Sequence, residues 1–224
     1  FTSSGLYSLG MLVDYIHLTQ KNNFPKLKIP VRFSNGSVMQ IDSSTRANLE
    51  IMETVDGKRE GSLVSIVDRT VTAAGARMLA SRFSSPLTNL KGITNRLNQV
   101  EAFFKNSEKI TDVRQKLINI LDIERSLNRL NLGRGSPRDL LAISQSLEQI
   151  PFVKKIIQSF NKSLDINYNS YFFEELSNLG DYKVLNKELS SAIIESPPYS
   201  VKDGGFIAKG YSKELDELVD LAEG

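Results

Sequence analysis

The sequence predicts an all-α protein of several packed helices, with one small β-hairpin near the N-terminus. Apolar residues recur every three or four positions along most of the 224 residues, which is the spacing of one face of a helix. Glycine, proline and serine gather between these runs, where helices end and begin. A single Asn35-Gly36 pair between two short apolar runs is the one clear hairpin signal.

The chain is expected to begin with a helix over residues 6–20, followed by the hairpin. The helix is predicted by an apolar side made of Leu9, Leu12, Val13 and Ile16. Residues 28–33 and 38–41 are the two expected arms of the hairpin. Pro30 would have to lie at the edge of the sheet, because its nitrogen carries no hydrogen to donate.

Three short helices are expected next, at residues 43–52, 62–68 and 72–81. Each starts at or beside an Asp, Ser or Thr, whose side-chain oxygen can accept hydrogen bonds from the free N–H groups of a first turn. Ser84-Ser85-Pro86 then interrupts the helical pattern. Two longer helices are predicted beyond it by two apolar stripes, namely Ile93, Leu97, Val100 and Phe104, and then Ile110, Val113, Leu117 and Ile120.

The most informative stretch is residues 122–140, where two predicted helices meet at a short joint (residues 133–139). The first of these helices has an apolar stripe made of Ile123, Leu127 and Leu130. Gly133 and Gly135 end it, because glycine is poor inside a helix and favoured just past its end. The joint therefore separates two helices instead of bending one.

The second helix of the joint opens with residues that suit a helix N-terminus. Ser136 can cap it, and Pro137 lies in the first turn, where the missing N–H costs nothing. Asp139 follows three residues after the cap, near the positive end of the helix dipole. Because a proline and a capped start hold the direction of a helix, we expect the joint to be a rigid corner and not a hinge.

The C-terminal part is expected to stay helical. Leu140, Leu141, Ile143 and Leu147 continue the stripe, Pro151 marks the start of another helix, and residues 161–169 form a loop. Pro197-Pro198 ends a later helix, and Asp203-Gly204-Gly205 forms a turn. The later helices are predicted by three stripes, namely Phe172, Phe173, Leu176 and Leu179; Leu185, Leu189, Ala192 and Ile193; and Leu215, Leu218 and Leu221.

Composition narrows the class of protein. The absence of cysteine excludes disulfides and thiolate metal sites and is typical of a reducing, cytoplasmic compartment. A net charge of +2 gives the chain as a whole no nucleic-acid signature. No apolar run approaches the roughly 18–20 residues that span a bilayer. The chain begins with Phe1 and no signal peptide follows, so we expect a processed chain or an excerpt of a longer protein.

No group of residues in the sequence predicts catalysis, cofactor binding or metal binding. His17 is the only histidine, and it lies in the middle of the first predicted helix. Glu174-Glu175 and Asp216-Glu217 come nearest to a metal-binding cluster, but adjacent residues on a helix point in different directions. We therefore expect no catalytic residue, no cofactor and no metal in this chain.

Arginines near the joint are the candidate pairing residues. Arg125 and Arg129 lie one turn apart on the same helix face, where like charges repel. We expect them to meet acidic partners on neighbouring helices, for which Asp68 and Asp139 are candidates. Arg138 is expected to pair with a carboxylate of the protein in the same way.

Two other functions fit parts of the same pattern. Gly133-Arg-Gly-Ser136 lies at a helix N-terminus and could hold a phosphate. With Arg134, Arg138 and Lys154-Lys155 it would make a DNA-binding module that contacts the backbone. A free-standing helical adaptor for a partner protein is the other alternative.

Four segments, in this order, resemble the MutS family of DNA mismatch-repair proteins, and together they cover nearly the whole chain. They are residues 39–50, residues 62–79 with Pro86-Leu87 after them, residues 122–140, and Pro197-Pro198 with residues 203–218. The resemblance implies that residues 1–42 are the end of a connector domain and a linker with the hairpin. Residues 43–224 would be the first segment of the core and lever domain, which stops before the DNA clamp.

The resemblance also implies what the chain does and what it lacks. It would be a non-catalytic lever that couples the ATPase to the DNA clamp of the parent protein. ATP and Mg²⁺ would bind to another domain, and DNA to the mismatch-reading and clamp domains. The parent would be a cytoplasmic homodimer without a membrane contact. Where the lever lacks its return arm, a stripe would stay uncovered, and the expected residues are Leu215, Leu218, Val219 and Ala222. The chain would then self-associate or be less stable than its size suggests.

Overall fold

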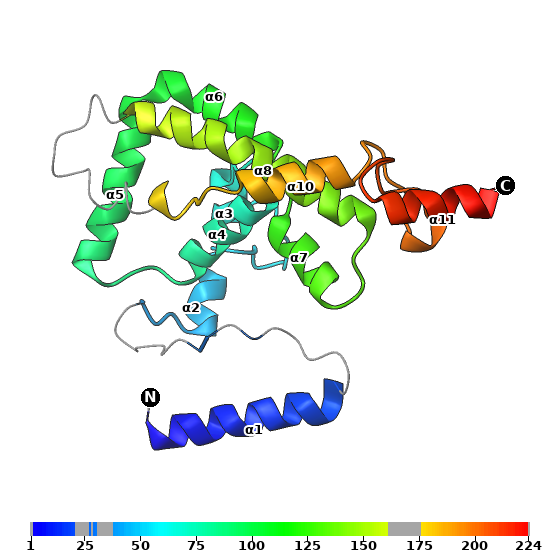
Figure 1. Ribbon diagram of the computed structural model, residues 1–224. Helices are drawn as coiled ribbons and strands as arrows, with labels where there is room; N and C mark the ends of the chain where they lie inside the picture. The colour runs from blue at the N-terminus through cyan, green and yellow to red at the C-terminus, as the bar shows by residue number, and fades with distance from the viewer. Residues whose placement is uncertain (1, 21–26, 28, 31–37, 161–175, 224) are drawn as a thin grey trace.

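The computed structural model describes residues 2–20, 27, 29–30, 38–160 and 176–223. The described residues form helices without a β-sheet, so the predicted all-α fold is confirmed (Figure 1). The helices are α1 (Ser3–Gln20), α2 (Ser43–Asn48), α3 (Leu63–Val67), α4 (Ala73–Ser84), α5 (Leu90–Lys105), α6 (Ser107–Ile118), α7 (Ile123–Asn131), α8 (Pro137–Gln158), α10 (Lys183–Ala192) and α11 (Lys213–Glu223). A short 3₁₀ turn, Val201–Asp203, precedes α11.

The predicted β-hairpin is not seen in the described residues. Its turn and most of its first arm, residues 28 and 31–37, lie outside them. Its second arm is described and forms no strand. Val38 instead makes an isolated antiparallel bridge to Leu87, and the Met39 N–H donates to the Pro86 carbonyl at 2.7 Å. These backbone groups therefore pair with the connection between α4 and α5, far along the chain, which turn chemistry at Asn35-Gly36 does not predict.

Helix α1 lies apart from the other helices in Figure 1 and has no buried residue. The predicted helix is therefore present. On its predicted apolar side Leu9, Val13 and Ile16 are half-buried and Leu12 is exposed, so the described residues cover that side only in part.

Local capping chemistry starts the short helices, as predicted. Asp42, Ser62 and Thr72 each accept a hydrogen bond from the backbone N–H three residues ahead, at the starts of α2, α3 and α4. Helix α2 ends earlier than expected because the chain turns at Glu50, which has a positive φ of 47°. The Glu50 carbonyl then accepts a hydrogen bond from the Leu63 N–H at 2.9 Å, which ties α2 to α3.

Helix α8 is central, and α6, α7 and α10 all pack against it. It continues through Pro151, so the prediction that a new helix begins there is wrong. A proline inside a helix removes one backbone hydrogen bond and costs roughly 3 kcal/mol. Buried apolar side chains on both sides of it, Leu147 and Val153, offset that cost.

The main buried cluster lies between the end of α8 and α6. Val113, Phe160 and Leu176 are buried together, and the Phe103 ring meets Phe160 edge to face with 5.2 Å between the ring centroids. The stripe predicted on α5 is largely uncovered: Leu97, Val100 and Phe104 are 61%, 65% and 79% exposed. Periodicity therefore predicted this helix correctly but not what covers it.

The C-terminal part folds back on the end of α10. Ile193 forms an antiparallel bridge with Ile207, and the Ala208 N–H donates to the Ala192 carbonyl at 2.8 Å. The intervening loop contains Pro197-Pro198 and turns at Gly204 and Gly205, which both have positive φ. Helix α11 projects away from the body in Figure 1. The expected loop 161–169 and Phe172 and Phe173 lie outside the described residues.

Candidate functional site

The joint between α7 and α8 (residues 133–139) begins with a fixed helix end. Gly133 has a φ of +67°, which glycine adopts without the steric penalty of a Cβ. Its N–H donates to the Leu130 carbonyl at 3.0 Å, and the Arg134 N–H donates to the Arg129 carbonyl at 2.9 Å. These are the two hydrogen bonds of a Schellman motif, so the direction in which the chain leaves α7 is set by its backbone.

Gly135 is required for space. A Cβ at this position would lie 2.8 Å from the Leu130 Cα and would collide with the Leu130 side chain. The space around a Cβ at Gly133, in contrast, is open. The chain therefore passes directly over the last turn of α7 at Gly135, and only glycine permits that approach.

Helix α8 then starts at Pro137 with Ser136 as its N-cap. The Ser136 N–H donates to Oδ2 of Asp139 at 2.9 Å, and the Ser136 hydroxyl donates to the same oxygen at 3.0 Å. The Asp139 residue is 5% exposed. A buried carboxylate thus lies at the positive end of the α8 dipole, which stabilises its charge.

Arg129 of α7 contacts the other oxygen of this carboxylate. Its Nε donates to Oδ1 of Asp139 at 2.9 Å, and its Nη2 makes a second contact with the same oxygen. Nη2 also donates to the hydroxyl of Ser126, a buried residue, at 3.2 Å. The hydrogen bonds from Arg129 lower the pKa of Asp139 below its usual range, against burial, which raises it. Asp139 is therefore ionised at neutral pH and links α7 to α8.

The start of α7 is held in a similar way. The Arg77 guanidinium, from α4, donates to both oxygens of Asp122 at 2.7 and 2.9 Å and to Glu124 at 3.2 Å. The hydrogen bond from Arg77 lowers the pKa of Asp122 to about 2. Beside it, the Leu121 N–H donates to the buried Ser146 hydroxyl of α8 at 2.9 Å. Helix α7 is therefore fastened to its neighbours at both ends.

Among the described residues, Arg138 pairs with no carboxylate, which differs from the expectation from the sequence. Its Nε donates to the Pro197 carbonyl at 3.1 Å, and its guanidinium lies 4.1 Å from the ring centroid of Tyr199. A cation above an aromatic face is attractive, and the planar guanidinium suits this contact. Arg138 thus fastens the loop after α10 to the first turn of α8.

The remaining predicted pairing residues are not brought together. Asp68 pairs with Arg59 at 2.7 Å, and neither Arg125 nor Arg129 reaches it. Within the described part of the chain, the Arg125 guanidinium makes no hydrogen bond or ion pair, and only its charge acts on Asp122. Of the two arginines on this face of α7, Arg129 alone closes the joint.

The same geometry argues against a phosphate at the joint. The α8 N-terminus already holds an anion, because the buried Asp139 carboxylate accepts the Ser136 N–H. A second anion would meet both an occupied donor and a like charge. Arg138 is also committed to Pro197 and Tyr199.

Arg77, Ser146 and Tyr199 complete this arrangement and were not among the residues predicted from the sequence. Arg77 lies 45 positions before Asp122, and Arg138 lies 59 positions before Pro197. No local pattern connects residues so far apart. The one available signal is Asp122-Ile-Glu124, since two carboxylates at the start of a helix favour a nearby cation.

In the described residues, no three His, Asp or Glu side chains gather closely enough to hold a metal ion. Over the same residues, no helix has both the length and the apolar character needed to cross a membrane.

Comparison with known proteins points to one family. The family model described as MutS domain III matches residues 44–223. Proteins named DNA mismatch repair protein MutS are 42% identical in Cereibacter sphaeroides (strain ATCC 17025) and 40% in Ruegeria sp. (strain TM1040), each over the whole chain. The protein of that name from Wolbachia pipientis wMel is 37% identical over 97% of the chain. The chain spans 25%, 25% and 28% of the length of these relatives.

Proposed function

Because the chain belongs to the MutS family and residues 44–223 match its domain III, we propose that it is a non-catalytic, load-transmitting part of a DNA mismatch-repair protein. In the whole protein it couples the ATP-binding part to the part that grips DNA. The relatives are much longer than this chain, so ATP, Mg²⁺ and DNA are assigned to other parts of the protein. We also propose that the whole protein is cytoplasmic and forms a homodimer.

The observation that supports coupling is the attachment of α7 at both ends. Arg77 joins its start to α4, and Arg129 joins its end to the buried Asp139 of α8. A helix held in this way moves together with its neighbours. Closely packed interiors change between discrete arrangements and do not deform smoothly, so a shift at one side reaches the other.

The joint supports the same proposal, because a rigid corner transmits a rotation that a flexible one would absorb. Its backbone is fixed at Gly133 by two hydrogen bonds and at Gly135 by close contact with Leu130. Its two helices share the Asp139 carboxylate. We therefore propose the joint as the corner through which motion passes between α7 and α8.

The test uses a full-length MutS protein that carries this chain as its domain III. Arg129→Ala removes the contact with Asp139, and Arg125→Ala is the matched control one turn away on the same helix. The measurement is the rate of ATP hydrolysis with and without mismatched duplex DNA. We expect Arg129→Ala to keep its rate without DNA and to lose most of its response to DNA, while Arg125→Ala keeps both.

An Arg129→Ala protein that responds to mismatched DNA like the parent would contradict the proposal. Circular dichroism at the assay temperature establishes that both variants are folded. Allosteric coupling is a free energy between two sites, so only a changed response to the second ligand counts as its loss.

A further inference from the structure

Pro151 lies inside α8, and its chemistry divides that helix. A proline has no N–H, so Pro151 cannot donate the helical hydrogen bond that the Leu147 carbonyl would accept. Proline is one of the few recognised causes of a sharp helix bend. Helix α8 therefore has an N-terminal half, residues 137–150, and a C-terminal half, residues 152–158, joined at its weakest backbone position.

The N-terminal half of α8 is attached to α7 and α10. Asp139 contacts Arg129 of α7, as described above. The Ser144 hydroxyl donates to Oδ1 of Asn186 in α10 at 2.8 Å. These contacts make one body from α7, α10 and the N-terminal half of α8.

The C-terminal half and the turn after it are attached to α5 and α6. Lys116 Nζ of α6 lies 4.8 Å from the centroid of the Phe152 ring. Lys109 Nζ of α6 donates to the Ser159 carbonyl at 3.1 Å, and Phe160 packs on Phe103 of α5. These contacts make a second body from α5, α6 and the C-terminal half of α8, and the named partners change at Pro151.

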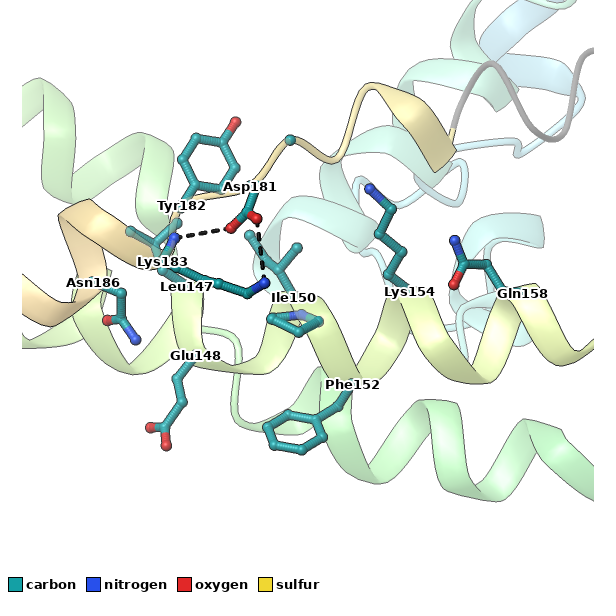
Figure 2. Close-up of a pocket in the computed structure, with 12 residues that line it drawn as sticks. Leu147, Glu148, Ile150, Phe152, Lys154, Gln158, Asp181, Tyr182, Lys183 and Asn186 are labelled. Carbon is teal, nitrogen blue, oxygen red and sulfur yellow. Dashed lines mark hydrogen bonds and ion pairs between the residues drawn. The ribbon is translucent and has the colours of Figure 1, made fainter.

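A cavity of about 440 Å³ lies where the two bodies meet. It is lined by Leu147 and Ile150 before Pro151, by Lys154 and Gln158 after it, and by the segment that starts α10. Figure 2 shows Asp181 and Tyr182 of this segment on the side of α8 toward which Lys154 extends. The C-terminal half of α8 therefore has unfilled space beside it on the side of α10.

We propose that Pro151 is a hinge about which the second body tilts against the first, with the cavity as the space that closes and opens. Gly180, with a φ of +50°, lies where the chain returns from the second body to α10 and accommodates the same motion. Two described hydrogen bonds tie α6 or the residues just after it to parts outside the second body, and the tilt must strain both. One is exposed and runs from Arg114 of α6 to the Arg69 carbonyl. The other runs from the Leu121 N–H to the Ser146 hydroxyl in the N-terminal half of α8. The joint at residues 133–139 moves as part of the first body.

The expected displacement follows from helix geometry. Sharp helix bends exceed roughly 20°. The C-terminal half of α8 is about 10 Å long at the rise of an α-helix, so a 20° tilt moves its far end by about 4 Å. Side chains on α6 move with it.

The absence of cysteine in the chain allows a direct measurement with paired spin labels. One pair of labels, at Gln115→Cys in α6 and Lys187→Cys in α10, measures the distance across the hinge. A second pair, at Asn128→Cys in α7 and Lys187→Cys, measures a distance within the first body and is the matched control. We expect the distance distribution across the hinge to be broader than the control by about 4 Å, and Pro151→Ala to remove that excess.

A cross-hinge distribution as narrow as the control would overturn the hinge, and so would an unchanged width in Pro151→Ala. Pro137→Ala, the same change in the first turn of the same helix, should leave the width as it is. The use of this motion in coupling rests on the proposed function, but the motion itself does not. If the distances show no motion at Pro151 while Arg129→Ala still abolishes the response to DNA, the hinge is rejected and the proposed function stands.

Discussion

Gly133 and Gly135 are two residues apart and are needed for unrelated physical reasons. Gly133 adopts a left-handed backbone in open space, whereas Gly135 lies where a Cβ would meet the Leu130 backbone. A substitution at Gly133 therefore strains the backbone only locally. A substitution at Gly135 displaces Leu130 and so disturbs α7.

The two glycines should therefore differ in their response to alanine. Gly133→Ala should lower the free energy of unfolding by about 1 kcal/mol, the cost of a left-handed backbone with a Cβ. Gly135→Ala should lower it by about 3 kcal/mol, because Leu130 must move. Urea unfolding of the two variants checks this, and Gly133→Asn should be milder than Gly133→Ala. Equal losses at the two positions would contradict the close approach at Gly135.

Acid should weaken the fold through the carboxylates that hold α7. The pKa values of Asp122 and Asp139 are lowered in the folded protein, mainly by hydrogen bonds from Arg77 and Arg129. Both groups bind protons more readily when unfolded, so their contribution is complete above pH 5 and is lost as the pH falls toward 2. We expect stability to decline over that range.

The Asp139→Asn variant isolates the share of one carboxylate. It should be less stable than the natural protein at pH 7, and the difference between the two should shrink as the pH falls. Urea unfolding at several pH values between 7 and 2 measures it. A difference that stays constant with pH would show that the charge of Asp139 does not contribute.

Residue-level chemistry made the local features of the joint predictable. The end of α7 at Gly133 and the Ser136 cap follow from backbone preferences over a few positions. Arg129 and Asp139 come together because only the joint separates them. Arg138 contacts the Pro197 carbonyl and the Tyr199 ring because the loop that contains them packs over it. This contact depends on the three-dimensional arrangement and could not be predicted from the local sequence.

Helix α7 depends on its two end contacts more than on its length. It has nine residues, which is short for a helix to be stable alone. Its buried residue is Ser126, which receives a hydrogen bond from Arg129. The ion pairs at its ends therefore act together with its packing on α8 to fix the helix.

Removing one end contact should thus be far more damaging than removing a free arginine. Arg129→Ala leaves the buried Asp139 without its cation and should lower the free energy of unfolding by about 2 kcal/mol. Arg125→Ala should change it by less than about 0.5 kcal/mol. Thermal and urea unfolding of both variants compare them, and similar losses would mean that the ion pair does not fix α7.

Among the helices, apolar periodicity predicted the positions correctly, whereas Pro151 as a helix boundary was a wrong prediction. Apolar stripes predicted α5, α6, α7 and α10, because a helix that is covered on one side carries its apolar residues on that side. Pro151 was misread because packing on both sides of it, at Leu147 and Val153, carries α8 across the break. The hairpin signal failed at Val38 and Met39, whose described pairing is with Leu87 and Pro86.

The molecule as a whole leaves large apolar faces uncovered by its described residues. On α11, the four residues that the resemblance implied would stay uncovered, Leu215, Leu218, Val219 and Ala222, are exposed. On α5 the stripe of Leu97, Val100 and Phe104 is exposed too. Periodicity could not distinguish these exposed stripes from buried ones. It shows that a helix has an apolar side, but it does not show what packs against that side. Exposed patches of this kind favour association.

The isolated chain should therefore self-associate through these faces. Sedimentation velocity at increasing concentration should show species larger than a monomer. Replacing the α5 stripe with glutamine (Leu97→Gln, Val100→Gln and Phe104→Gln) should shift the population toward monomer without unfolding the helix. A natural chain that stays monomeric at high micromolar concentration would contradict this expectation.

Coupling through the joint is best measured as the equilibrium affinity of the full-length protein for mismatched DNA, with and without a non-hydrolysable ATP analogue. The ratio of the two dissociation constants is the coupling between the sites. We expect Arg129→Ala to bring this ratio toward one and Arg125→Ala to preserve the parent value. A parent-like ratio in a folded Arg129→Ala protein would show that motion does not pass through the joint.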